Sequence, residues 1–294
     1  MMNKVKKQHF VPRFYLKRFT NNNGKIFVFD IQTQSQFGTT AENVAHKKFF
    51  YDYEPLDKIA GDQSIEKALA HMEGESALVL NKTIELLEKG NLHEQTNKDK
   101  AIIAEFIAIQ QMRTSESRKR SEQLHTEVER QLKQKGGADF LKNSGFYSAN
   151  HDPKFIQTIN FFSPELEKGI KEYTDRYWIY WDNQTKYNFY TSDNPVVGHI
   201  HEKIRFSAYE IFFPLTPRFG LSIALKKEFQ NMANYDNKIV PLTNKENIKF
   251  YNSLIVTNCN RQIFNNEMDF RLAKKILKKK PELSNPNRQR FARM

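Results

Sequence analysis

The sequence predicts an α+β fold in which long helices pack on a mostly antiparallel sheet, with a β-hairpin near the N-terminus. Between residues 64 and 135, apolar side chains recur at the three- to four-residue spacing of amphipathic helices. From Arg176 onwards apolar and polar side chains alternate, as they do in half-buried strands. The chain of 294 residues is predicted to be a single domain, with possible subdomains over 1–136 and 154–280.

The segment of residues 8–19 is dense in side chains that bind phosphate or transfer protons. Pro12 fixes its own φ and moves Val11 towards extended geometry. His9 is therefore expected on an extended segment, and Arg13 at the start of a short helix or turn. This arrangement would hold the imidazole and the guanidinium near each other.

The N-terminal hairpin is predicted from a turn and two aromatic segments. Residues 21–24, Asn-Asn-Asn-Gly, form a turn that leads into a strand over 25–31. A polar loop is predicted over 34–40, and a second short strand or sheet edge over 47–53. We expect the two strands to form the hairpin.

The first long helix is predicted to begin at Ser64 and to end at Lys89, before Gly90. Glu66 and Glu73 share one face of this helix, at the border of its apolar stripe. Two interpretations are open for these acids. They are either surface carboxylates that pair with lysines or carboxylates that face a ligand.

A second long helix is predicted from Asn97 to Lys135, ended by Gly136-Gly137. Its apolar stripe would place Gln110 and Arg113 towards the core, where a polar side chain is costly unless it is paired. Arg113 is therefore expected either to pair with one of the two acids of the first helix or to point into a polar pocket.

The second half of the chain is predicted to consist mostly of strands, after a linker over 136–153. A hairpin is expected from strands over 177–181 and 187–191, with its turn at Asp182-Asn183. The other predicted elements are helices over 164–173, 245–258 and 268–279, strands over 196–200, 211–213, 221–225 and 262–264, a rigid bend over 214–217, and a flexible tail after Pro281.

Asp193 and Asn194 directly follow the second strand of this predicted hairpin. Both side chain types favour local bonds to the backbone, so a simple turn at the strand end is one interpretation. In the other, the turn presents the Asp193 carboxylate at the mouth of a site, because loops often carry catalytic groups.

Positive charge is concentrated at the two ends of the chain, which has a net charge of +12. Residues 1–18 carry six Lys and Arg with no acid, and residues 271–294 carry nine against one Glu. These ends predict contact with a polyanion such as RNA or DNA, and the alternative is a solvated tail. No apolar run is long enough to span a membrane, no secretion signal is visible, and Cys259 is a single cysteine. We therefore expect a cytoplasmic protein without a membrane partner.

Several common enzyme classes are unlikely on their motifs. The sequence has no glycine-rich phosphate loop, dinucleotide fingerprint, zinc-protease helix or serine nucleophile elbow, which argues against common kinases, dehydrogenases and proteases. His199 and His201 would share one face of a strand as a metal pair. Because a metal site needs three or four donors, a solvent-facing hairpin is the favoured interpretation.

Two catalytic arrangements remain, and the first uses a metal ion. In it, Glu66, Glu73 and Asp193 bind a divalent cation such as Mg²⁺, while Arg113 or Arg13 steadies a phosphate. The side chains expected to contact the substrate are Gln8, Arg13, Lys17, Glu66, Gln110 and Asn194.

The second arrangement needs no metal. His9 acts as general acid or base, and Arg13 and Arg113 stabilise charge on the transferring phosphoryl group. A lone histidine in an aromatic segment can equally be a hydrogen-bonded core residue. Across both arrangements, the predicted catalytic residues are His9, Glu73, Arg113 and Asp193.

Four segments together carry a resemblance to a known family. They are Gln8–Phe19, Gln110–Thr114 (QQMRT), Thr191–Val196 (TSDNPV) and Phe213–Pro217 (FPLTP). With these segments in this order over residues 8–264, the chain resembles the bacterial family of domain of unknown function 4238. Ser115 departs from the family pattern, which has proline there, and this affects the expected local helix geometry. The resemblance implies a connection with bacterial defence and mobile-element genes.

The leading hypothesis is a nuclease-like hydrolase that acts on RNA or DNA, as an effector of bacterial anti-phage defence. It would work as a homo-oligomer or with a defence-system partner protein. The alternative is a non-catalytic protein that senses nucleic acid or a phage component, in which the polar cluster is structural. A third possibility is an enzyme for a small phosphorylated or nucleotide ligand, which a closed pocket too small for a strand would indicate.

Overall fold

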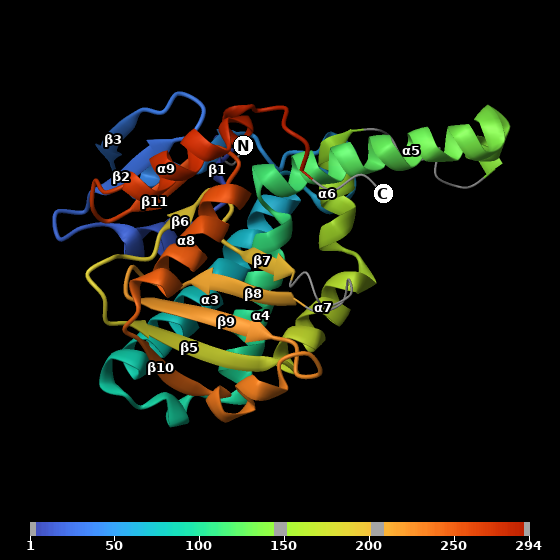
Figure 1. Ribbon diagram of the computed structural model, residues 1–294. Coiled ribbons are helices and arrows are strands. Elements are labelled where there is room, and N and C mark those ends of the chain that lie inside the picture. The colour runs from blue at the N-terminus through green and yellow to red at the C-terminus, as the bar shows by residue number, and fades with distance from the viewer. Residues whose placement is uncertain (1–3, 144–151, 201–208, 291–294) are drawn as a thin grey trace.

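The computed structural model describes residues 4–143, 152–200 and 209–290 (Figure 1). Helices and antiparallel-dominated sheets make up the fold, so the prediction of an α+β protein is confirmed. A five-stranded sheet has the order β10 (Lys238–Leu242), β5 (Tyr177–Asn183), β9 (Phe219–Ala224), β8 (Tyr209–Pro214) and β7 (Val197–Ile200). Within it, β10 and β5 run parallel and the other neighbours are antiparallel.

Helices cover both faces of the five-stranded sheet. The long helices α3 (Ser64–Lys89) and α4 (Asn97–Met112) lie behind it in Figure 1, and α8 (Lys245–Asn258) lies in front. Along β5, Trp178 packs in the same core cluster as α3 and α4, whereas Ile179 packs with α8. The alternation of a strand thus sends successive apolar side chains into two cores.

A second, four-stranded antiparallel sheet has the order β3 (Gln36–Thr39), β2 (Ile26–Asp30), β11 (Gln262–Asn265) and β6 (Thr191–Ser192). The N-terminal hairpin is present in this sheet, since β2 pairs with β3. The predicted partner was wrong, because β3 lies in the segment predicted to be a polar loop. A partly exposed edge strand such as β3 lacks the apolar alternation of a core strand.

The remaining N-terminal strands form a separate pair of β1 (Lys7–His9) and β4 (His46–Lys48). This pair is antiparallel and sets His9 opposite His46. The helix α1 (Arg13–Leu16) follows directly and begins after Pro12, as the sequence predicted. The short helix α2 (Glu54–Ala60) occupies the segment between β4 and α3.

The first long helix has the predicted bounds, and Gly90 ends it with φ +73° in the left-handed region. The second helix starts at Asn97, the residue predicted to cap it. Thr96 is the cap, and its side chain and that of Asp99 each accept a backbone N–H from the other residue.

The second helix is not continuous to Lys135, which corrects the prediction. Helix α4 ends at Met112, and a new helix, α5 (Ser115–Asn143), begins two residues after Arg113. Ser115 is therefore the first residue of a helix. Helix α5 also passes through Gly136-Gly137, which were predicted to end it, and projects away from the body of the molecule (Figure 1).

The predicted hairpin of 177–181 and 187–191 is wrong. β5 pairs with β9 and β10, while β6 lies in the other sheet beside β11. Because both faces of β5 are buried, it needs a neighbour on each edge and takes them from distant segments. The elements predicted over 196–200, 211–213, 221–225, 245–258 and 262–264 are present, as are the predicted helices α7 (Pro164–Thr174) and α9 (Arg271–Lys279). Helix α6 (Pro153–Phe161) was not predicted.

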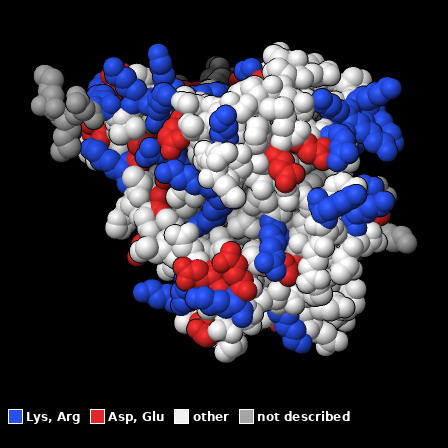
Figure 2. All heavy atoms as spheres, turned by 90° about the vertical axis from the view of Figure 1, so that its left-hand side faces the viewer, with Lys and Arg blue, Asp and Glu red and all other residues white. Residues whose placement is uncertain are grey.

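Charge of both signs is distributed over the side of the molecule that carries α8 and α9. Figure 2 shows Lys and Arg side chains gathered in several groups on this side, with Asp and Glu between them. Helix α9 contributes exposed cations from Arg271 to Lys279. Among the helices of the described segments, none combines the length and the apolar character that a membrane crossing requires.

Candidate functional site

The β1–β4 pair brings together two imidazoles and two lysines. His9 lies opposite His46, and their ring centroids are 5.1 Å apart. Lys7 and Lys48 form the next pair on the same face of the ribbon. The lysines are exposed and the imidazoles are half-buried. We call this face, defined by Lys7, His9, His46 and Lys48, the histidine face.

The imidazoles of the histidine face are held in their neutral form. Burial, then His46 and then Arg13, lowers the pKa of His9 from 6.5 to about 4. Burial and Lys7 also lower the pKa of His46. The Nε2 atom of His9 and the Nδ1 atom of His46 are buried and have no hydrogen-bond partner. Each ring therefore offers an unused nitrogen at neutral pH.

Arg113 ties the histidine face to the helices. Its side chain is 1% exposed and its Nη2 atom donates to the His9 carbonyl oxygen at 2.8 Å. The same atom pairs with Glu73 Oε1 at 2.7 Å, and Nε donates to the Tyr51 hydroxyl at 3.2 Å. The Tyr51 hydroxyl donates in turn to the Arg113 carbonyl oxygen at 3.0 Å. These contacts fix the Arg113 side chain at the C-terminal end of α4.

Glu66 lies on the same face of α3 as Glu73 and belongs to this cluster. Burial raises the pKa of Glu66 to about 7; Arg113 opposes this effect and Glu73 adds to it. Its Oε2 atom is buried without a partner, as is Nη1 of Arg113. Arg13 and Arg113 act on the pKa of both His9 and Glu66, so the four side chains share one neighbourhood.

The raised pKa of Glu66 predicts a specific dependence of stability on pH. In the unfolded chain this carboxyl ionises near its ordinary value of 4.5, but in the folded protein it ionises only near 7. The folded state thus retains a proton that the unfolded state has lost, and stability falls as pH rises through this window. Glu66→Gln does not ionise. Its stability relative to wild type should rise by about 1–2 kcal/mol over the window, after allowance for solvent screening, and stay level above it.

Urea unfolding of both proteins at a series of pH values from 4 to 8.5 measures this difference. The opposite effect of His9, which destabilises the folded state as pH falls below 6.5, is present in both proteins and largely cancels. A difference in stability that stays constant across the series would contradict the burial of Glu66 as an ionisable group.

Other residues predicted to bind substrate have structural roles. The Gln8 side chain is fully buried; its Nε2 donates to Asp52 at 2.5 Å, and its Oε1 accepts the Tyr51 N–H at 2.6 Å. Gln110 donates to the Phe10 carbonyl oxygen at 2.9 Å. These two glutamines therefore hold the N-terminal segment in place.

The two predicted cations of the N-terminal segment are at the surface. Arg13 is exposed at the start of α1, and Lys17 is exposed with its Nζ 3.7 Å from Glu42 Oε1. Of the two, Arg13 acts on the pKa of His9 and Glu66 and is the one placed at the cluster.

Asp193 lies in a different cluster, where its carboxylate is buried and bonded to the backbone. Its carboxylate accepts the backbone N–H groups of Asn260, Arg261 and Gln262 at 2.8, 2.8 and 3.0 Å, and the residue is 1% exposed. Burial raises its pKa to about 6 despite these three bonds. The carboxylate therefore fixes the turn between α8 and β11, which corrects the prediction that it opens into a site.

Asn194 joins the same region to the break between α4 and α5. Its Oδ1 atom accepts the Thr114 hydroxyl at 2.9 Å, and its Nδ2 atom donates to the Asn258 carbonyl oxygen at 2.9 Å. Both ends of this amide are used within the protein, so a structural role replaces the predicted contact with substrate.

The predicted set of metal ligands is not assembled. Across residues 4–143, 152–200 and 209–290, no three His, Cys, Asp or Glu side chains are grouped as a metal ion requires. Glu66 and Glu73 share the Arg113 cluster, whereas Asp193 is enclosed by its own turn. The possible metal pair of His199 and His201, for which a solvent-facing hairpin was the favoured interpretation, lies partly outside the described residues, because residue 201 is not described.

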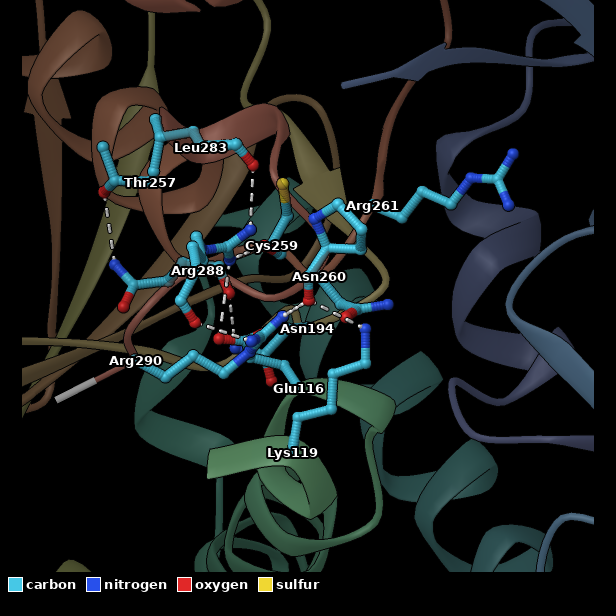
Figure 3. Close-up of polar contacts among 12 residues, drawn as sticks. Glu116, Lys119, Asn194, Thr257, Cys259, Asn260, Arg261, Leu283, Arg288 and Arg290 are labelled. Carbon is cyan, nitrogen blue, oxygen red and sulfur yellow. Dashed lines mark hydrogen bonds and ion pairs between the residues drawn. The ribbon is translucent and has the colours of Figure 1, made fainter. Parts of the chain in front are cut away.

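The C-terminal segment forms a second polar cluster on α5, seen in Figure 3. Arg290 Nε donates to Glu116 Oε2 at 2.9 Å, and Arg288 Nη2 lies 3.5 Å from Glu116 Oε1. The side chains of Arg290, Arg288 and Glu116 are 1%, 7% and 3% exposed, respectively. The flexible, solvated tail predicted after Pro281 is therefore wrong as far as residue 290.

His46 was absent from the predicted site, although it faces His9 directly. Its role depends on the pairing of β4 with β1, which no local pattern shows. One sequence feature could have pointed to His46. It is followed by Lys47, Lys48 and two phenylalanines, a mixture of basic and aromatic residues like the one around His9.

Comparisons with known proteins give one match. A family model described as "Protein of unknown function (DUF4238)" matches residues 7–269, which is most of the chain and includes the histidine face. A search of curated proteins and a search of solved structures each returned no match.

Proposed function

The chain belongs to the DUF4238 family, and from the chemistry that its fold gathers at the histidine face we propose that it cleaves RNA by acid–base catalysis. One observation carries the proposal. His9 and Glu66, which both lie within the electrostatic reach of Arg13 and Arg113, have pKa values moved in opposite directions, His9 to about 4 and Glu66 to about 7. Such a pair supplies a base and an acid at the same pH.

The roles follow from the protonation states. The hydrogen bond of the His9 ring to the backbone of Glu42 leaves Nε2, which has no partner, as the nitrogen that accepts a proton. Because Nε2 is buried, the proposal requires that bound RNA displace the side chains that cover it. Glu66, with a pKa of about 7, retains its proton in a large fraction of molecules at neutral pH. His9 is thus the proposed general base and Glu66 the proposed general acid.

RNA suits this chemistry because it carries its own nucleophile. His9 would remove the proton of a ribose 2′-hydroxyl, whose oxygen then attacks the adjacent phosphorus. The bond to the 5′-oxygen breaks, and Glu66 would give that oxygen its proton, which leaves a 2′,3′-cyclic phosphate. Arg13, which is exposed and acts on the pKa of both groups, would stabilise the charge on the phosphoryl oxygens.

Two further cations support a phosphodiester substrate. Lys7 and Lys48 are exposed on the same face of the ribbon as the imidazoles. Lysines beside a catalytic pair would bind the phosphates that flank the cleaved one, and this contact would weaken as salt rises. The chain offers these charges from β1 and β4, the strands that also place the histidines.

A cleavage assay in EDTA tests the proposal. Wild type should cut single-stranded RNA and leave DNA of the same sequence intact, because DNA lacks the 2′-hydroxyl. His9→Ala should lower the rate about 100-fold or more, the usual contribution of a general base. His71→Ala is the matched control, since His71 is exposed on α3 and should leave the rate unchanged.

Two results would reject cleavage at this site: RNA that stays intact with wild type, or His9→Ala that cuts as fast as wild type. The second candidate function, nucleic-acid binding without turnover, is favoured by the structural use of Arg113 and Gln8. It predicts salt-sensitive binding of RNA to wild type and to His9→Ala alike, with weaker binding when Lys7 and Lys48 are both replaced by glutamate.

A further inference from the structure

A cavity of about 370 Å³ lies between α8, α9 and the segment 186–190. It shares no residue with the histidine face, so a ligand site in this cavity would be independent of RNA cleavage. Its size falls within the range of about 300–1,000 Å³ that small-molecule sites occupy. The side chains that line it are of three kinds, each suited to a different part of one ligand.

The cavity is pre-formed, because hydrogen bonds within the protein hold the buried side chains of its wall in place. Asn252 Oδ1 accepts the Tyr190 N–H at 2.8 Å, and Asn252 Nδ2 donates to the Asn188 carbonyl oxygen at 2.9 Å. The Tyr190 hydroxyl donates to the Asp269 carbonyl oxygen at 2.8 Å, and its ring lies 5.7 Å from that of Phe270. Because these bonds fix the segment against both helices, a ligand would meet a rigid site.

The rim of the cavity carries two cations that the protein does not pair. Lys249 Nζ is 2.7 Å from Glu246 Oε1, and Arg271 Nη2 is 2.6 Å from Asp269 Oδ2, so these two cations are neutralised. Within the described segments, the other two cations of the rim, Lys186 and Lys275, form no ion pair. A ligand phosphate would supply the counter-charge for both.

The remaining lining offers an aromatic face and a carboxylate. Tyr187 is half-buried and Leu272 lies with it in the cavity wall. Lys186 Nζ lies over the Tyr187 ring, 5.9 Å from its centroid, so a planar base that stacks on this ring would move the lysine aside towards the phosphate. The carboxylate of Glu267 is an acceptor for hydroxyl donors such as those of ribose. From this combination of base, sugar and phosphate contacts, we propose that the cavity binds a nucleoside monophosphate.

Calorimetry on the full chain tests the site with the four 5′-ribonucleoside monophosphates, with adenosine and with inorganic phosphate. At least one nucleotide should bind saturably and at least about tenfold more tightly than either partial ligand, since each partial ligand lacks one set of contacts. The absence of saturable binding for all four nucleotides overturns the proposal, as does inorganic phosphate that binds as tightly as they do.

Charge reversal at the rim locates the binding. Lys186→Glu combined with Lys275→Glu should weaken the nucleotide at least about tenfold, because it removes both unpaired cations. Lys278→Glu is the matched control, since Lys278 is exposed on α9 but does not line the cavity, and should bind as wild type does. Equal affinity of the double variant and wild type would place the nucleotide elsewhere and overturn the assignment.

A free nucleotide and the end of an RNA strand share the same chemistry, so two probes separate them. A 5′-phosphorylated tetranucleotide that displaces the mononucleotide and loses affinity in the double variant assigns the site to strand ends. A tetranucleotide that does not compete assigns it to free nucleotides. Because none of the lining residues belongs to the histidine face, His9→Ala should retain nucleotide binding even if cleavage is lost.

Discussion

Glu116→Ala is expected to lower the free energy of unfolding by about 3–5 kcal/mol, the usual cost of breaking a buried ion pair from one side. The Glu116 side chain is 3% exposed and pairs with Arg290 at 2.9 Å and with Arg288 at 3.5 Å. Alanine would leave two buried guanidinium groups without a counter-charge. Urea unfolding, followed by the fluorescence of Trp178 and Trp181, measures the loss.

An exposed ion pair provides the control for this prediction. Glu54 pairs with Lys58 at 2.7 Å, but their side chains are 77% and 72% exposed, so Glu54→Ala should leave the urea midpoint close to that of wild type. A double-mutant cycle with Arg290→Ala should give a coupling of more than about 1 kcal/mol to Glu116. Equal costs for Glu116→Ala and Glu54→Ala would show that the C-terminal segment is not held by this pair.

Arg113→Ala should destabilise the protein by a similar amount, about 3–5 kcal/mol. The guanidinium serves the His9 carbonyl oxygen, the Glu73 carboxylate and the Tyr51 hydroxyl at once. Alanine would leave all three without this donor. Since the Glu73 side chain is only 25% exposed, water replaces the lost ion pair poorly.

Two further variants sharpen the Arg113 prediction. Arg113→Lys retains the charge but has no planar fork to serve several acceptors, so its loss of stability should lie between those of wild type and Arg113→Ala. Arg120→Ala, at an exposed position of α5, should change stability by about 0.5 kcal/mol or less. If Arg113→Ala unfolds at the same urea concentration as Arg120→Ala, Arg113 does not hold β1 to the helices.

Helix boundaries were predicted well where the chain carries its own start and stop signals. The helix from Ser64 to Lys89 is followed by Gly90 in a left-handed conformation, which glycine adopts without strain. Its start was predicted less exactly, because Ser64 is the first residue of the helix and not its cap. The helix over 245–258 begins after Asn244, whose side chain accepts the Glu246 N–H. Such signals act within one or two turns, so the sequence alone reveals them.

In the sequence, the break between α4 and α5 at Arg113 shows only as an interruption of the apolar pattern. Gln110 and Arg113 interrupt the apolar stripe, but no proline or glycine marks an end, so the pattern predicted one continuous helix. The interruption was correctly associated with ion pairing, since Arg113 does bind Glu73. At this break Arg113 also bonds to the His9 carbonyl oxygen of β1, 104 residues earlier in the chain.

The candidate site was predicted in part. His9, Glu66, Glu73 and Arg113 are brought to one neighbourhood, while Asp193 is not. A carboxylate that follows a strand can open into a site or bind its own turn, and the sequence pattern is the same for both. Three backbone N–H groups of residues 260–262 decide the matter for Asp193.

By itself, the sequence determined the fold class, the family, most helices and the residues that disturb an apolar pattern. The tertiary structure alone decided which strands pair, where α4 ends and which charged groups are buried. The physical reason is that these outcomes depend on contacts between distant segments, such as Glu116 with Arg290, which are 174 residues apart. The free energy of such a contact belongs to the folded arrangement, and no local stretch of the chain contains it.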